Sequence, residues 1–225
     1  MNNLEERRNL LFECYSKWAD QLDKSLLSNN YSNPYYVSIP DDWFDNGKIR
    51  IMIVGEEGAG NWGCGKTIWK GFNDTVWECK SEEDIKRIQE YNSKQTYYQL
   101  STTQKDKWYK KNNGRFWNRI RSIKMINSDK VVIVWNNLDK IHGINEYSPC
   151  LNPADREKLH STKIKILAEE IKILEPNIIV FCGWSKRENA FKAELSSEFV
   201  PVYNKFFKKI NGRYECEQFK DHNNE

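Results

Sequence analysis

Two adjacent carboxylates follow directly on an apolar segment and are the residues of this chain best suited to chemistry. The segment Ile49 to Val54 is almost entirely Ile, Met and Val, and Gly55-Glu56-Glu57-Gly58-Ala59 comes next. Such an apolar run is typical of a strand buried on both faces, and open parallel sheets bind ligands beyond the carboxyl ends of their strands. We therefore predict a reactive site at Glu56 and Glu57. The alternative is a solvated loop whose glycines only form a turn.

A second segment, Lys105 to Lys124, interleaves basic and aromatic residues. Its cations can contact phosphates, while Trp108, Tyr109, Phe116 and Trp117 offer surfaces on which bases stack. This pattern suits a nucleic-acid backbone. The alternative is an ordinary solvated helix face with its aromatic rings turned into the core.

The stretch Gly60 to Thr67 fits the pattern G-x-x-x-x-G-K-[ST] of a phosphate-binding loop. In that motif the first glycine follows the strand directly, whereas Gly55 to Ala59 intervene here. No later apolar strand ends in an acidic residue that would hold magnesium. We therefore keep nucleotide hydrolysis only as a less favoured alternative.

Cysteine usage and net charge limit the remaining classes. The six cysteines include no C-x-x-C pair and no His at ligand spacing, so we predict no metal site, neither zinc nor an iron–sulfur cluster. A net charge of +3 is too small to indicate a nucleic-acid partner by itself. No run of apolar residues is long enough to span a membrane and the amino terminus carries no targeting segment, so we expect a cytoplasmic protein. Nothing in the sequence suggests an oligomer, so we expect a monomer.

The elements that must position these residues alternate between helices and strands. We predict helices at Leu4 to Leu27, Ser81 to about Leu100, Thr103 to Asn112, Asn152 to Leu174 and Ser185 to Leu195. We predict buried strands at Ile49 to Val54, Val131 to Trp135 and Asn177 to Cys182, with a fourth strand at Phe199 to Tyr203.

This order predicts a single α/β domain over 1–225, a three-layer α/β/α sandwich with a central, mainly parallel four-stranded sheet. Residues 1–48 would supply the N-terminal helix and a connection, and residues 49–203 the core. Residues 204–225 would form a hairpin and tail, because Asn211-Gly212 favours a tight hairpin turn. His142 and His160 are expected on a loop and a helix face, with no identifiable partner.

Three blocks of the chain lie at or beside the predicted strands, namely Gly55 to Ala59, Asn137-Leu138-Asp139-Lys140 and Pro176 to Gly183. In this order they resemble the first motif, the Asn-Val-Val-Lys block and the Pro-x-x-hydrophobic-Gly block of the uracil-DNA glycosylase superfamily. The order of the blocks agrees with that of the family over Ile49 to Leu195. The resemblance implies a three-layer α/β/α fold and cofactor-free cleavage of a base from deoxyribose, with DNA as the partner.

The resemblance also implies roles for individual residues. Glu57, with Glu56 in reserve, would stabilise an oxocarbenium-like sugar and orient the attacking water. Asn137 would read the edge of a flipped-out base, and Trp62, Trp69 and Phe72 are candidates for its aromatic platform. The candidate DNA-binding cations are Lys66, Lys110, Lys111, Arg115, Arg119, Lys140, Lys186 and Arg187.

Two departures from the family pattern refine the expected substrate. Ala59 stands where the uracil-specific branch has Tyr, which leaves room for a substituent at pyrimidine C5. We therefore hypothesise a modified pyrimidine, such as hypermodified cytosine in phage DNA, and a role in antiviral defence. The His-Pro motif of the family is not recognisable, and His222 is the only late histidine available for its catalytic role. A uracil-excising repair enzyme and a noncatalytic nucleic-acid-binding protein of the same fold are the alternatives.

Overall fold

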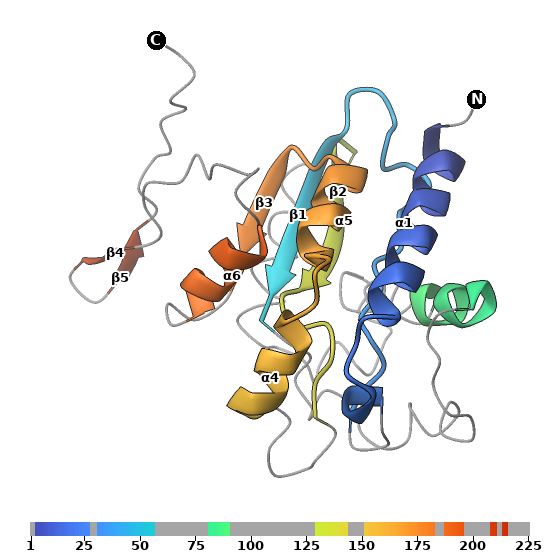
Figure 1. Ribbon diagram of the computed structural model, residues 1–225. Coiled ribbons are helices and arrows are strands. Elements are labelled where there is room, and N and C mark those ends of the chain that lie inside the picture. The colour runs from blue at the N-terminus through green and yellow to red at the C-terminus, as the bar shows by residue number, and fades with distance from the viewer. Residues whose placement is uncertain are drawn as a thin grey trace, which may run out of the picture.

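A parallel sheet of three strands forms the core of the part of the chain that the structure describes. The computed structural model describes residues 3–27, 31–56, 81–90, 129–143, 151–182, 187–195, 208–210 and 213–215. Strands β1 (Ile49–Gly55), β2 (Val131–Asn137) and β3 (Ile178–Phe181) pair in the order β2-β1-β3 (Figure 1). All three run in the same direction, so their carboxyl ends lie at one edge of the sheet. The parallel α/β class is therefore confirmed, whereas the predicted fourth strand lies outside the described residues.

Strand β1 is buried on both of its faces, as its apolar sequence predicts. Met52 and Val54 belong to the main hydrophobic core, while Ile51 and Ile53 pack into a second cluster on the opposite face. Strand β2 contributes to both clusters in the same alternating way. Strand β3 differs from our prediction of a third buried strand, because Ile178 is 47% exposed. Among the described strands β3 pairs only with β1, so it forms an edge of the described sheet.

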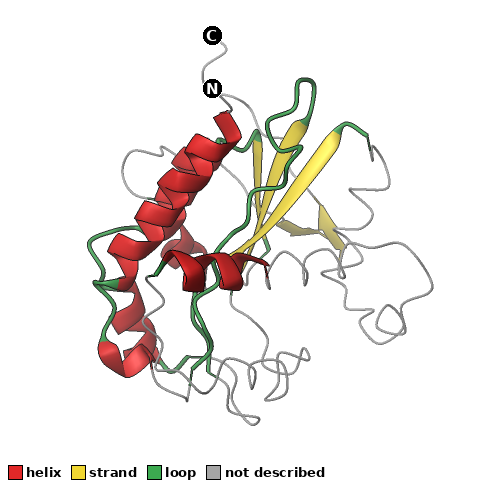
Figure 2. Cartoon of the chain, turned by 90° about the vertical axis from the view of Figure 1, so that its right-hand side faces the viewer, coloured by secondary structure: helices red, strands yellow, loops and turns green. Residues whose placement is uncertain are grey.

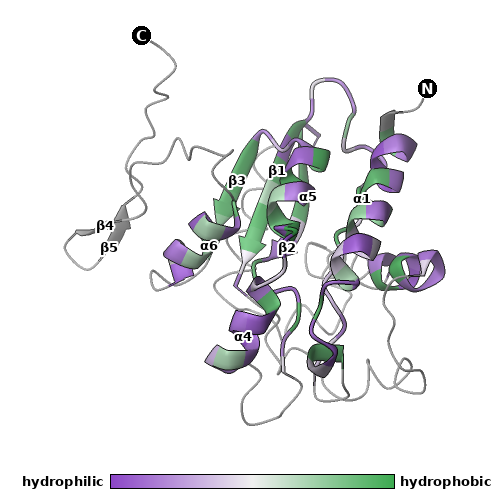
Figure 3. Cartoon of the chain, viewed as in Figure 1, coloured by the Kyte–Doolittle hydropathy of each residue, from purple (hydrophilic) through white to green (hydrophobic). Residues whose placement is uncertain are grey.

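The main core lies between the sheet and a layer of helices. Helices α1 (Asn3–Ala19) and α5 (Ile166–Leu174) pack against each other, and α1 stands to one side of the strands in Figure 2. In Figure 3 the strands of the parallel sheet have mainly the hydrophobic colour, whereas much of the helices has the hydrophilic colour. The helix predicted from Ser81 is described over 82–90, and its cap is confirmed because Ser81 Oγ accepts from Asp84 N at 3.1 Å. The helix predicted at Thr103 to Asn112 lies outside the described residues.

The single helix predicted from Asn152 to Leu174 is wrong, since the structure forms two. Helix α4 (Pro153–His160) begins as predicted, with Asn152 Oδ1 accepting from Asp155 N at 2.9 Å and Pro153 in the first turn. The hydroxyl of Ser161 then donates to the Lys158 carbonyl at 2.7 Å. The buried Thr162 hydroxyl donates to the carbonyl of Ile164 at 3.1 Å. These side-chain to backbone bonds favour a turn over a continued helix, so α5 starts anew at Ile166.

The remaining boundaries differ in detail. Helix α1 ends at Ala19, and a separate 3-10 helix, η1 (Lys24–Leu27), completes the segment that we predicted as one helix. Helix α6 (Glu188–Glu194) is shorter than predicted. Strands β4 (Lys208–Ile210) and β5 (Arg213–Glu215) pair antiparallel, which confirms the hairpin predicted around Asn211-Gly212. In the described part of the chain, no helix is long and apolar enough to cross a bilayer.

Candidate functional site

Backbone hydrogen bonds join the carboxyl ends of β1 and β2 at Glu56, the first of the two adjacent carboxylates. Gly55 and Asn137 are register partners. Beyond them, Leu138 N donates to the Gly55 carbonyl at 2.8 Å and Asp139 N donates to the Glu56 carbonyl at 2.7 Å. The half-buried Glu56 is thereby held at the edge where ligands of parallel sheets bind.

The carboxamide of Asn137 is the most notable polar group at this edge. Asn137 is only 2% exposed, and within the described residues Oδ1 has no hydrogen-bond donor. A Cβ atom at Gly55 would lie 2.9 Å from this oxygen, so glycine leaves the space that the carboxamide occupies. A buried acceptor without a donor costs roughly 1–3 kcal/mol, which an N–H group of a ligand would offset.

A buried polar cluster lies beneath the same strand end. We call it the Lys140 cluster, and it comprises Tyr15, Asn136, Lys140 and Glu170. Lys140 Nζ lies 2.6 Å from Glu170 Oε2, and both side chains are fully buried. Glu170 also accepts from Asn136 Nδ2 at 2.8 Å and from the Tyr15 hydroxyl at 2.7 Å. Lys140 Nζ donates in addition to Asn136 Oδ1.

The Lys140 cluster fixes the backbone that carries Asn137. Asn136 Oδ1 accepts from Asn137 N at 2.8 Å, so the side chain held by Lys140 and Glu170 also binds the next peptide group. Burial lowers the pKa of Lys140, although the charge of Glu170 opposes this shift. Burial and the neighbouring Glu170 carboxylate raise the pKa of Tyr15.

The prediction that Lys140 binds DNA is corrected by this geometry. Its ammonium group faces Glu170 inside the fold rather than solvent, so it cannot meet a phosphate on the surface. Its role in the structure is to hold the strand end.

A second ionic cluster surrounds the carboxylate of Asp139 at the same edge. We call it the Asp139 cluster, and it comprises Asp139, Arg156, His160, Lys165, Arg187 and Glu194. Asp139 accepts from Arg156 Nε at 2.8 Å, and it lies 2.7 Å from His160 Nε2. An Arg187 nitrogen also donates to Asp139.

The second carboxylate of this cluster, Glu194, comes from α6. Glu194 lies 2.8 Å from His160 Nδ1 and 3.4 Å from Lys165 Nζ. The cluster thus connects the loop after β2 with helices α4 and α6.

His160 is held as a cation by two carboxylates. Burial alone would lower the pKa of its imidazole, but the hydrogen bonds to Asp139 and Glu194 raise it to about 9. Burial alone would likewise raise the pKa of Asp139, but the bonds from His160 and Arg156 and the charge of Arg187 lower it. The prediction that His160 has no partner is therefore wrong. His142 lies on a loop as predicted, and burial lowers the pKa of its imidazole to about 4.

The structure brings together part of the predicted site. Glu56, Asn137 and Arg187 lie at or beside the carboxyl edge of the sheet. The other predicted site residues lie outside the described residues, namely Glu57, Ala59, Trp62, Lys66, Trp69, Phe72, Lys110, Lys111, Arg115, Arg119, Lys186 and His222.

Sequence reasoning missed Asp139, His160 and Glu170 as functional or supporting residues. Glu170 could have been found, because it interrupts the apolar run Ile166-Leu167-Ala168 and Ile171 of α5, and a charge on a buried helix face requires a partner. Asp139 and His160 meet only through the fold, since they are separated by 21 residues in sequence.

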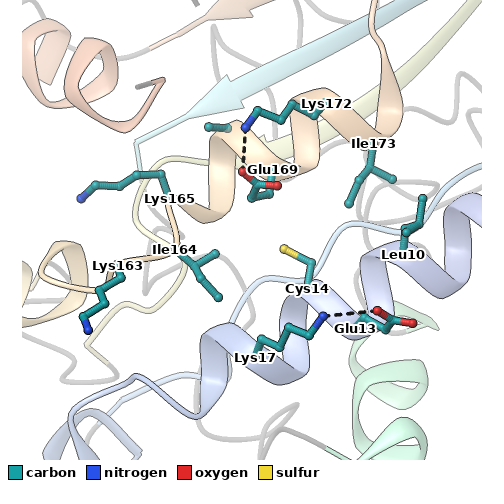
Figure 4. Close-up of a pocket in the computed structure, with 11 residues that line it drawn as sticks. Leu10, Glu13, Cys14, Lys17, Lys163, Ile164, Lys165, Glu169, Lys172 and Ile173 are labelled. Carbon is teal, nitrogen blue, oxygen red and sulfur yellow. Dashed lines mark hydrogen bonds and ion pairs between the residues drawn. The ribbon is translucent and has the colours of Figure 1, made fainter. Parts of the chain in front are cut away.

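A pocket of about 460 Å³ lies between α1 and α5, and Lys165 of the Asp139 cluster is among the residues that line it (Figure 4). Its cations Lys17 and Lys172 pair with Glu13 at 3.3 Å and Glu169 at 2.9 Å. Burial, together with the charges of Glu170 and Glu169, raises the pKa of the Cys14 thiol to about 12. A protonated thiol is a poor nucleophile, so this pocket is a weaker candidate than the sheet edge.

Metal ligation receives no support from the described residues, which contain no group of three or more His, Cys, Asp or Glu able to hold an ion.

Comparison with known proteins leaves the function open. No family model, no curated protein and no solved structure matches the chain. The function must therefore be argued from the residues themselves.

Proposed function

We propose that this protein is a DNA glycosylase that hydrolyses the N-glycosidic bond of a flipped-out, modified pyrimidine and leaves an abasic site. The observation that supports this proposal is the buried Asn137 carboxamide, whose oxygen faces Gly55 and lacks a donor among the described residues. The Asn137 carboxamide belongs to the carboxyl edge of the sheet, where Glu56 and Glu57 follow β1 in the sequence.

A carboxamide is suited to reading a pyrimidine. The edge of a cytosine or uracil presents an N–H donor next to carbonyl or ring-nitrogen acceptors, and a carboxamide can accept from the first and donate to the second. Burial makes such recognition selective, because a base that lacks the donor leaves the Asn137 oxygen unpaired. Removal of the base from the DNA stack is needed before it can enter a site of this kind.

Glu57 is the proposed catalytic carboxylate. It follows Glu56 directly, and the Glu56 carbonyl is fixed by the N–H of Asp139 at 2.7 Å. A carboxylate near the anomeric carbon stabilises the developing oxocarbenium ion and orients water, as in glycoside hydrolysis. Glu57→Gln keeps the size of the side chain and removes its charge, so it should abolish base release without abolishing DNA binding.

The proposed substrate is a pyrimidine with a bulky C5 group, since Ala59 is small. Hypermodified cytosine in phage DNA has this property, and its removal would make the protein an antiviral defence enzyme that acts as a cytoplasmic monomer without a cofactor. Excision of plain uracil in base repair is the alternative substrate assignment within the same mechanism.

A panel of DNA substrates tests the proposal. Purified protein is incubated with uracil-containing oligonucleotides, with ordinary phage DNA and with phage DNA that carries hypermodified cytosine. Alkaline cleavage then detects abasic sites, and mass spectrometry identifies the released base. We expect release from the modified DNA that is lost in Glu57→Gln. Release of uracil alone would assign the enzyme to repair, and no release from any substrate would favour a noncatalytic DNA-binding protein.

A further inference from the structure

The three strands of the parallel sheet each contribute one position to a row at its carboxyl edge. Asn137 of β2 and Gly55 of β1 are register partners, and β1 lies between β2 and β3. On the other side of β1, Val54 pairs with Phe181 of β3. Cys182 N then donates to the Val54 carbonyl at 2.8 Å, so the ladder continues for one residue past β3. Cys182 is therefore the residue of the third strand that lies level with Gly55 and Asn137.

The side chains of this row belong to one face of the sheet. Trp135 of β2 and Val180 of β3 both pack against the second hydrophobic cluster, on the face opposite the main core. Successive side chains of a strand alternate between the two faces, so Asn137 follows Trp135 and Cys182 follows Val180 on that face. Asn137 and Cys182 therefore flank the same face of Gly55 from opposite sides.

Gly55 places no side chain in the middle of the row. A Cβ atom there would lie 2.9 Å from Asn137 Oδ1 and 3.4 Å from Trp135 Nε1, so a carboxamide oxygen and an indole ring border the position that a side chain would take. Neighbouring strands are about 4.8 Å apart, which separates the backbones at Asn137 and Cys182 by roughly 10 Å. A single ring that donates to Asn137 Oδ1 beside Gly55 can therefore reach the Cys182 side chain.

The two edges of a pyrimidine ring match the two flanking side chains. The hydrogen-bonding atoms of cytosine and uracil lie on one edge, whereas C5 and C6 on the opposite edge are carbon atoms. Asn137 Oδ1 is buried and has no donor among the described residues, so it favours the hydrogen-bonding edge. The carbon edge then faces Cys182, whose side chain behaves as a small apolar group.

We propose that Cys182 contacts the C5 side of the flipped-out pyrimidine and limits the size of the C5 substituent that the site accepts. The inference rests on the proposed function, because it takes the base to be bound at Asn137. Cysteine is small and Cys182 is exposed, so a substituent at C5 can extend past it toward solvent. A larger side chain at this position should exclude that substituent.

The first experiment tests the position of Cys182 by disulfide trapping. A single-stranded oligonucleotide carries one cytosine whose C5 bears a thioethyl tether, activated as a mixed disulfide with a small thiol. The Cys182 thiol loses its proton to water and attacks the tether sulfur, a protein–oligonucleotide disulfide forms, and the small thiol leaves as its thiolate. Peptide mapping by mass spectrometry identifies the modified cysteine. We expect about tenfold more adduct at Cys182 than with the same tether on N4, which lies on the edge that Asn137 binds.

Asn137→Ala is the control for base placement. It should lower the C5-tether adduct at Cys182 to the level of the N4 tether, while labelling of Cys182 by a small disulfide reagent without DNA stays unchanged. The label remains on Cys182 even if the base is later released from the DNA. Equal adduct from the two tethers, adduct that does not depend on Asn137, or no adduct at Cys182 would each overturn the proposal.

The second experiment tests the size limit and does not require Asn137→Ala to fold. Fluorescence anisotropy measures the affinity for an oligonucleotide with one C5-propynyl cytosine and for the same oligonucleotide with ordinary cytosine. Cys182→Phe should weaken binding of the propynyl oligonucleotide about tenfold relative to the ordinary one. Ile178→Phe is the matched control, because Ile178 lies on the same strand at its amino end and is 47% exposed. It should leave the ratio of the two affinities unchanged. Equal ratios for Cys182→Phe and Ile178→Phe would overturn the proposal.

The outcomes separate this inference from the glycosylase proposal. Base release from modified phage DNA by the wild type, without trapping at Cys182, would reject the C5 contact and leave the enzyme intact. Trapping at Cys182 that depends on Asn137, without base release from any DNA, would support the C5 contact and reject the enzyme.

Discussion

Two ionic clusters begin in the same short loop after β2 and differ in size and exposure. The Lys140 cluster pairs one cation with one carboxylate, and both side chains are fully buried. The Asp139 cluster contains four cations and two carboxylates among the described residues, and the side chains of its cations are 15–33% exposed. Neighbouring residues of one loop therefore have different roles. The first cluster fixes the strand end, and the second connects the loop after β2 with helices α4 and α6.

The difference follows from the cost of burying charge. A fully buried ion pair is tolerated only when its geometry is good and its remaining polar atoms are bonded, which the bonds of Asn136 and Tyr15 to Glu170 provide. The Asp139 cluster is partly exposed, so water screens its ion pairs more than it screens the fully buried pair. The comparison predicts that removing the ammonium group of the fully buried pair costs more stability than removing one charged group of the partly exposed Asp139 cluster.

The largest expected effect is that of Lys140→Met. Removal of the ammonium group leaves the Glu170 carboxylate buried without its counter-charge, which should lower the free energy of unfolding by about 3–5 kcal/mol. Urea denaturation followed by circular dichroism measures the change. The double variant Lys140→Met/Glu170→Leu removes both charges and should regain most of the loss. A single variant as stable as the wild type would show that the pair does not hold the strand end.

The second effect concerns the pH dependence that His160 gives to stability. Its pKa is raised from 6.5 to about 9 in the fold, so its stabilising contribution is fully present below pH 6.5 and is lost as the pH rises through 9. The loss should be on the order of 3 kcal/mol. Urea midpoints of the wild type and His160→Gln, measured between pH 6 and pH 10, isolate this contribution. Parallel pH profiles for the two proteins would contradict a cationic His160 between two carboxylates.

The smallest expected effect on stability is that of Arg156→Gln. Asp139 keeps His160 and Arg187 as partners, and the Arg156 side chain is 22% exposed. The free energy of unfolding should therefore change by less than about 1 kcal/mol. Thermal unfolding of Arg156→Gln and of Lys140→Met, measured under the same conditions, compares the two losses of stability. A loss as large as that of Lys140→Met would mean that the two clusters do not differ in the way proposed.

Much of the sheet could be predicted from the sequence, because β1 and β2 have apolar runs that are typical of strands buried on both faces. The break between α4 and α5 could not, since Thr162 interrupts the helix through a hydroxyl bond that helical periodicity does not reveal. Strand β3 has an equally apolar sequence but is partly exposed, because burial depends on neighbours in the sheet.

The candidate site was predictable where it depends on strand ends and not where it depends on distant contacts. Asn137 follows an apolar strand, which was enough to place it at the carboxyl edge. Lys140 follows the same strand, yet it turns inward because Glu170 lies buried on α5, 30 residues away in sequence. The Asp139 cluster likewise depends on α4 and α6 reaching one loop.

The most direct test of the central claim is base release by variants of the Asn137 site under single-turnover conditions. Modified phage DNA is incubated with the wild type, Asn137→Ala and Gly55→Ala, and the released base is quantified by mass spectrometry. We expect Asn137→Ala to slow release at least about 100-fold through loss of base recognition. Gly55→Ala should slow it as well, because its Cβ would lie 2.9 Å from Asn137 Oδ1 and displace the carboxamide. Release by both variants at the wild-type rate would contradict the claim that this edge of the sheet binds the base.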